Sequence, residues 1–197
     1  MKRLIIVAVM AAVVCSCAKE EPKSPLELAI EQKAVESVAD HPYTFKITKL
    51  ELLDSTTFRT EFERRTKVFQ VRFDQNNKLF QRYMKEGLRE NAMSKVPIMR
   101  KDRNRVAALD SMKTRMGDSI DMIAYYDYLV SADVTVDKQT LDFEDVYFAI
   151  TPDNRILSMT KNKKDLHKAT GFAIPGYDLL LKSWDGTGDQ LDETPVE

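Results

Sequence analysis

The two cysteines of this chain are the first side chains to consider for reactive chemistry. Cys15 and Cys17 are the only thiols among 197 residues. A thiol can act as a nucleophile, bind a metal, form a disulfide or carry an acyl chain. A disulfide between residues only two apart would be strained. Cys15 directly follows an apolar run of 11 residues, 4–14, and Cys17 lies two positions farther on, which links both cysteines to the leader of the chain.

Residues 1–22 resemble a bacterial lipoprotein signal. The chain begins with two basic residues, the apolar run is shorter than the ~20 residues of a spanning helix, and the small Ser16 precedes Cys17. The resemblance implies cleavage before Cys17, which would then carry lipid at the mature N-terminus, while Cys15 would leave with the leader. The alternative is an ordinary secretion signal with accidental cysteines. A chain lipidated at Cys17 has no free thiol, which excludes thiol catalysis and thiolate zinc sites.

The residues after Cys17 carry a second resemblance. Lys19, Glu20 and Glu21 lie two, three and four residues beyond it. They resemble the export signal of Bacteroidota surface lipoproteins, which implies an outer-membrane protein that is lipid-anchored and exposed at the cell surface. The alternative is the start of a solvated linker. The chain as a whole is similar to small Bacteroidota lipoproteins of unknown function, and the membrane is its first expected partner.

The remaining reactive side chains are histidines and carboxylates. We interpret His41 and His167 as surface or turn residues, because neither lies in a metal-binding motif. Asp142, Glu144 and Asp145 are candidates for a carboxylate-dependent hydrolase of envelope polymers, but an acidic hairpin turn explains them equally well, and they lack the order of a calcium loop. The sequence contains no nucleotide-binding glycine motif or nucleophile elbow. We therefore predict a protein that is not an enzyme, with no cofactor, no metal, no catalytic residue and no identified small-molecule substrate.

Capping patterns and periodicity predict the elements that position these residues. Ser24, followed by Pro25 and Glu27, is typical of a capped helix start. The expected apolar stripe of that helix is Leu28, Val35 and Val38, with Ile30 beside them, and His41-Pro42 is expected to end it. A strand is expected over 43–54. Three antiparallel strands are expected within 121–134, 141–150 and 151–160, with a tight turn at 152–154, followed by a basic loop and a helix at about 177–184.

The most regular part of the sequence predicts a long helical hairpin. Two sets of large apolar residues recur every eleven positions: Phe58, Phe69 and Phe80, and Phe62, Phe73 and Met84. Eleven residues are about three helical turns, so all six share one stripe of a helix over about 56–92, with a break at 76–77 or at Gly87. We expect a second helix that Ser94 caps and Gly117 ends. The two helices should pack antiparallel along their apolar stripes.

Charge is strongly segregated along the chain. Residues 56–115 hold sixteen Lys or Arg and seven acidic residues, a net charge of +9, whereas the whole chain is at −1. Either the basic hairpin is neutralised within the fold by an acidic sheet, or it binds an anion such as an anionic polymer. Arg59, Arg72 and Lys78 are the candidate anion-binding residues. The aromatic residues lie on the apolar stripe and do not alternate with the cations, which argues against base stacking.

The expected organisation is a signal peptide over 1–16, a lipidated tether over 17–25, a single α+β domain over 26–184 and an acidic disordered tail over 185–197. The order of helix, strand, helical hairpin and meander resembles cystatin-like and NTF2-like folds, a likeness that specifies no function. The expected role is binding or scaffolding at the cell envelope, with an anionic polymer or an envelope protein as the partner.

Overall fold

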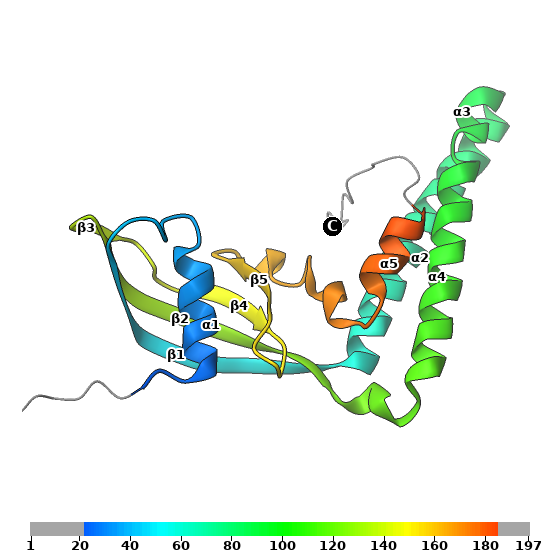
Figure 1. The fold of residues 1–197 in the computed structure, drawn as a ribbon. Helices are drawn as coiled ribbons and strands as arrows, with labels where there is room; N and C mark the ends of the chain where they lie inside the picture. The colour runs from blue at the N-terminus through cyan, green and yellow to red at the C-terminus, as the bar shows by residue number, and fades with distance from the viewer. Residues whose placement is uncertain (1–21, 185–197) are drawn as a thin grey trace, which may run out of the picture.

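The computed structural model describes residues 22–184. An antiparallel sheet carries one helix on a face, and a long helical hairpin extends from one end of the sheet (Figure 1). This arrangement confirms the predicted α+β class and the predicted order of the elements. The predicted leader, the start of the tether and the acidic tail lie outside the described residues.

The first helix begins as predicted and ends earlier. Helix α1 (Pro25–Val35) starts with a complete capping box, in which Ser24 Oγ accepts from the backbone N–H of Glu27 and the Glu27 carboxylate accepts from the N–H of Ser24. The expected end at His41-Pro42 was wrong, since the regular helix stops at Val35. Leu28 was wrongly placed on the core stripe and is exposed, because only Ile30 and Val35 face the sheet deeply enough to be buried.

The sheet is built on two long strands. Strand β1 (Tyr43–Thr57) pairs antiparallel with β2 (Ile123–Val136) along its whole length. The next neighbours are β4 (Val146–Ile150) and β5 (Ile156–Thr160), while the short β3 (Gln139–Leu141) pairs with the end of β2. The meander β2-β4-β5 is the predicted one, and the turn 151–155 joins its last two strands. Phe143 and Met122, which fall within the expected strand ranges, lie outside the strands.

The hairpin follows β1 without a loop. Helix α2 (Phe58–Lys85) begins directly after Thr57, whose Oγ1 accepts from the N–H of Thr60, and α4 (Val96–Met116) returns beside it to β2. The expected single helix over 56–92 is interrupted at Gly87, one of the two predicted break points. Its φ of +73° is a conformation that glycine adopts without steric cost. The short α3 (Arg89–Met93) follows.

Ser94 does not cap α4, which corrects the prediction. It ends α3, and its hydroxyl donates to the carbonyl of Asn91. The residue before α4 is Lys95, which makes no side-chain cap. At the other end, α4 stops at Gly117 as predicted, and the 3₁₀ turn η1 (Gly117–Asp121) leads into β2.

Three apolar regions hold the fold together, and two of them are large. One lies between α1 and the face of the sheet formed by β1, β2 and β4. The other joins Phe62 and Phe69 of α2 to Leu109 and Met112 of α4 and to α5 (Tyr177–Trp184), the helix predicted at 177–184. The 3₁₀ turns η2 (Lys163–Asp165) and η3 (Thr170–Ala173) lead to α5. The predicted contact between the two hairpin helices is thus confirmed where α5 also covers them.

Candidate functional site

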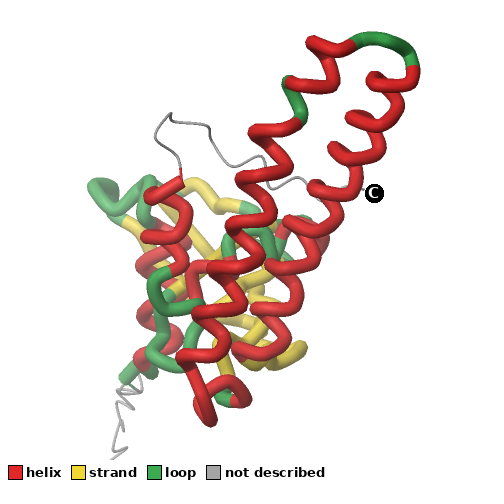
Figure 2. Tube along the Cα trace, turned by 90° about the vertical axis from the view of Figure 1, so that its right-hand side faces the viewer, coloured by secondary structure: helices red, strands yellow, loops and turns green. Residues whose placement is uncertain are grey.

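The hairpin has two parts with different surroundings. We call residues 58–77 with 101–116 the hairpin base, and residues 78–100 the hairpin tip. The base packs on α5, η1 and η3. The tip consists of the end of α2, α3 and the first turn of α4, and it extends beyond the sheet and α5 in both views (Figures 1 and 2). This difference decides how each cation of the hairpin is neutralised.

Two of the three candidate anion-binding residues lie in the hairpin base and have carboxylate partners. Arg59 donates two hydrogen bonds to Asp121 of η1, at 2.7 and 2.9 Å. This contact raises the pKa of Arg59 and lowers that of Asp121. Arg72 Nε lies 3.0 Å from a carboxylate oxygen of Asp102, a fully buried residue of α4. The charges of both arginines are therefore paired with carboxylates within the fold, although only the Arg72 pair includes a buried group.

The third candidate, Lys78, lies in the tip and is exposed. The tip contains six Lys or Arg and two Glu. Arg82 pairs with Glu86 at 2.9 Å. The remaining exposed cations are Lys78, Lys85, Arg89 and Arg100, and none of these four forms an ion pair with a residue that the structure describes. Lys78, Arg82 and Lys85 share the outer face of α2 and line a shallow hollow of about 400 Å³. The tip is thus the part of the hairpin where positive charge is left for a ligand.

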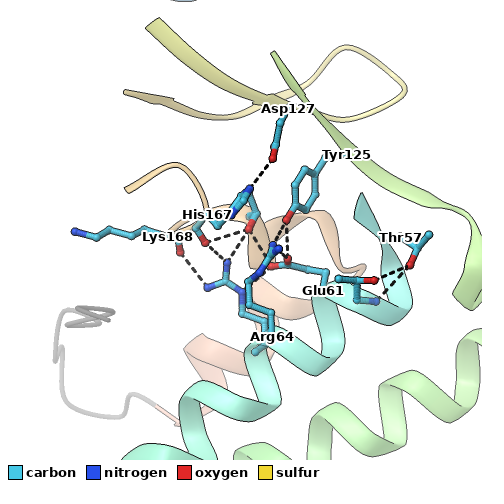
Figure 3. A network of polar contacts seen from close by, with 10 residues as sticks. Thr57, Glu61, Arg64, Tyr125, Asp127, His167 and Lys168 are labelled. Atoms are coloured by element: carbon cyan, nitrogen blue, oxygen red, sulfur yellow. Dashed lines mark hydrogen bonds and ion pairs between the residues drawn. The ribbon is translucent and has the colours of Figure 1, made fainter. Parts of the chain in front are cut away.

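A buried polar network fixes the hairpin base to the sheet (Figure 3). Its centre is Glu61, which has no exposed surface. The guanidinium groups of Arg64 and Arg65 donate to Glu61 at 2.8 and 2.7 Å, the Tyr125 hydroxyl donates at 2.9 Å, and Thr170 Oγ1 lies 3.0 Å away. One carboxylate of α2 therefore joins β2 and η3 to the hairpin.

Arg65 extends this network to the loop before α5. Its guanidinium donates to the carbonyls of His167 and Lys168 and to the hydroxyl of Thr170. Gly171 permits this close approach, since a Cβ there would lie 2.9 Å from Arg65 Nε and 2.5 Å from the Tyr177 ring. The charge of Glu61 is compensated on several sides, which is the condition under which a buried carboxylate is tolerated.

The buried network changes the pKa of Tyr125. Burial of its hydroxyl, together with the negative charge of Glu61, raises the pKa of Tyr125 to about 12. The phenol is consequently a neutral donor at physiological pH. A phenol with a raised pKa is a poor acid, and this one already donates to Glu61, so the contacts that it makes here are structural.

His167 adds a hydrogen-bonded contact at the edge of the network. Its Nε2 lies 2.7 Å from a carboxylate oxygen of Asp127 on β2, and the ring packs against that of Tyr125. The second oxygen of Asp127 is buried and has no hydrogen-bond partner among the described residues. We had interpreted His167 as a surface or turn residue. It lies in a turn, but it also binds the sheet.

The acidic turn places its carboxylates in solvent. Asp142 pairs with Lys161 at 2.5 Å, and this contact lowers the pKa of Asp142. Asp145 lies 3.5 Å from Lys49, and Glu144 is exposed. A general acid needs a raised pKa, which is the opposite direction to that of Asp142. In the described part of the chain, no three His, Cys, Asp or Glu side chains are grouped so that they could hold a metal ion.

The predicted anchor cannot be placed in the structure. Cys17, Lys19, Glu20 and Glu21 lie outside the described residues. Within residues 22–184, no helix combines the length and the apolar character needed to cross a membrane.

Sequence reasoning missed the buried network because its members are far apart in the chain. Glu61 and Thr170 are separated by 109 positions and Arg65 and His167 by 102. The only local signal was the spacing of Glu61, Arg64 and Arg65, which suits ion pairs on a helix but is equally common on exposed faces. No protein-family model, curated protein or solved structure matches this chain.

Proposed function

We propose that this chain is a non-catalytic, lipid-anchored protein of the cell envelope that binds an anionic ligand through its hairpin tip. The observation that carries the proposal is the group of exposed cations in the tip, Lys78, Lys85, Arg89 and Arg100, which form no ion pair with any described residue. The anchor rests on the resemblance of residues 1–22 to a lipoprotein signal.

The two alternatives for the +9 hairpin apply to different parts of it. In the base, Arg59, Arg64, Arg65 and Arg72 pair with carboxylates, so their charge is used within the fold. In the tip, the cations outnumber the acids by four. Unpaired cations on a projecting element attract anions over about a Debye length, ~8 Å at physiological ionic strength.

The position of the first described residues supports a presenting role. Helix α1 packs on the sheet, and the hairpin tip lies at the opposite end of the molecule (Figure 1). A tether that leads into α1 would therefore leave the tip remote from the point of attachment. Helix α2 is 28 residues long, which is ~42 Å at 1.5 Å per residue. Such a length can hold a binding surface well away from an anchor.

The test measures binding to heparin and duplex DNA at several salt concentrations. A chain of residues 18–197 contains every residue that the structure describes and lacks the predicted leader. We expect the wild type to bind, and Lys78→Glu/Lys85→Glu to bind weakly. For DNA, the double variant should lower the slope of log affinity against log salt by about 2, since each lost phosphate contact contributes about 0.9.

The matched control is Lys163→Glu/Lys164→Glu. Both lysines are exposed in η2, remote from the tip, and the change in net charge is the same. Equal loss of binding in both double variants would show that net charge alone attracts the polymer. If the wild type binds neither polymer at low salt, the proposed function is wrong.

A further inference from the structure

The hairpin tip also carries large apolar side chains in solvent. Met84 is 47% exposed, Leu88 45% and Met93 53%. Ile98, at the start of α4, is exposed as well. These four residues come from α2, the turn at Gly87, α3 and α4, and they lie among the six cations of the tip. Large apolar side chains are exposed elsewhere on this protein as well, but in the tip they coincide with cations that form no ion pair within the described chain.

The apolar stripe of α2 explains how this surface arises. At the base, Phe62 and Phe69 are buried against α4 and α5. Farther along the same stripe, Phe73 and Phe80 are half-buried and Met84 is exposed. Within α3 only Ala92 is buried, so this short helix turns Met93 outward. The stripe therefore continues past the point where the fold can cover it, into the part that projects (Figure 2).

We infer that the hairpin tip docks onto a phospholipid surface with acidic headgroups, one that faces the end of the molecule opposite the proposed anchor. In this arrangement Met84, Leu88 and Met93 enter the interface between headgroups and acyl chains, and the neighbouring cations contact the phosphates. The inference rests on the proposed function and names the ligand class of the same site. A bilayer interface offers both partners at once, since apolar groups bury at the acyl boundary and Lys and Arg are attracted to acidic lipid.

Two other occupants fit the tip less well. A soluble polyanion would contact the cations and leave the apolar side chains in water. A second copy of this chain, docked tip to tip, would bring two surfaces together that each have four more cations than acids. Lipid is the partner that matches both the charge and the apolar surface.

The experiment measures sedimentation of residues 18–197 with vesicles. One set is phosphatidylcholine alone, and the other is an equimolar mixture of phosphatidylcholine and phosphatidylglycerol. We expect binding to the acidic vesicles only. The variant Met84→Gln/Leu88→Gln/Met93→Gln should lose at least about tenfold in vesicle affinity and keep its affinity for heparin. Lys78→Glu/Lys85→Glu should weaken both.

The matched control is Leu52→Gln/Met122→Gln/Leu179→Gln. These three residues are the most exposed large apolar side chains of the described chain and lie outside the tip. The control should bind acidic vesicles as the wild type does. Since residues 18–197 contain no cysteine, a single Met93→Cys can also carry an environment-sensitive fluorophore. Its emission should shift to the blue with acidic vesicles and stay unchanged with heparin.

Each outcome separates the inference from the proposed function. Wild-type vesicle affinity in the triple tip variant, or binding to heparin without binding to vesicles, would overturn the lipid inference and leave anion binding in place. Self-association that the triple tip variant abolishes would identify a second copy as the occupant and would also overturn it. Failure to bind either vesicles or heparin would overturn both proposals.

Discussion

Glu61 is the residue on which the attachment of the hairpin depends. It lies fully inside the protein, and donors from α2, β2 and η3 meet at its two oxygens. Buried ion pairs of this kind contribute modest net stability, but removing one partner leaves the other charge without compensation. The loss of Glu61 would remove from Arg65, which is 3% exposed, the carboxylate that lies 2.7 Å from its guanidinium group.

We predict that Glu61→Ala lowers the free energy of unfolding by about 3–5 kcal/mol. Urea unfolding followed by circular dichroism would measure the change. Glu63→Ala is the matched control, because Glu63 is exposed two positions away and its nearest cation, Lys113, is 3.8 Å distant. The control should change stability by less than about 0.5 kcal/mol. Equal effects of the two substitutions would contradict the role given to Glu61.

Tyr125 makes the network sensitive to alkaline pH. Its pKa is about 12 in the folded protein and about 10 in an unfolded chain. Between these values the folded state holds a proton that the unfolded state has lost, so the free energy of unfolding falls as pH rises. The full contribution is present below about pH 10 and is lost by about pH 12.

We predict that the wild type loses more stability than Tyr125→Phe between pH 9 and pH 12, because only the wild type carries this titrating phenol. Chemical unfolding of both proteins at matched pH values would show it. The difference between the two is the informative quantity, since other tyrosines and the lysines titrate in the same range. Parallel pH profiles for the two proteins would refute the prediction.

The predicted lipidation of Cys17 can be tested with single substitutions. If it is the lipidated residue, Cys17→Ala should block acylation and processing, whereas Cys15→Ala should leave both intact. Growth of the producing cells with a radioactive fatty acid would reveal the label on the protein. Label retained by the Cys17→Ala protein would exclude this cysteine as the lipidation site.

At the scale of elements, α2 and α4 use their cations in different ways along their length. Arg72 bridges from α2 to the buried Asp102 of α4 and lies over the ring of Phe69. Lys78, six positions farther along α2, is exposed and forms no ion pair within the described chain. The two residues belong to one basic sequence pattern, but only Arg72 contributes to the packing of the helices.

Charge reversal should therefore separate these two residues. Arg72→Glu places a second carboxylate beside Asp102, and we predict a loss of about 3 kcal/mol or more in the free energy of unfolding. Lys78→Glu should change it by less than about 0.5 kcal/mol. Thermal or urea unfolding of the two single variants would decide. A large effect from Lys78→Glu would mean that the tip cations neutralise acidic groups of the fold.

At the scale of the whole molecule, the two ends carry different tasks in our proposal. The N-terminal end leads through α1 toward the proposed anchor, and the hairpin tip at the other end carries the unpaired cations and the exposed apolar residues (Figure 1). The anchored protein can bind its ligand only if both lie on the same side of the membrane. The proposed function therefore depends on the side to which the protein is exported.

The export signal makes that side testable. If Lys19, Glu20 and Glu21 direct the protein to the cell surface, replacing all three with Ala should keep it membrane-bound but protect it from protease added to intact cells. Immunoblotting before and after protease treatment gives the readout. Equal digestion of both versions would contradict the signal's role.

The sequence by itself determined the features that depend on neighbours in the chain. The capping box of α1, the bounds of α5, the turn between β4 and β5 and the break at Gly87 were all predictable, because caps, glycine conformation and periodicity act over a few residues. The end of α1 and the role of Ser94 were predicted wrongly. Helix α1 stops at Val35, and Ser94 ends α3 and does not cap α4, since packing decides how far a helix continues.

Only the tertiary structure decided which side chains are covered and which charges are paired. The apolar stripe of α2 repeats evenly from Phe58 to Met84, but it is buried only where α4 and α5 lie against it. Arg65 donates to carbonyls that lie 102 and 103 positions farther along the chain. Arg72 donates to a carboxylate that lies 30 positions farther along. Periodicity carries no record of such distant contacts, because burial and ion pairing depend on what the rest of the chain places opposite each helix.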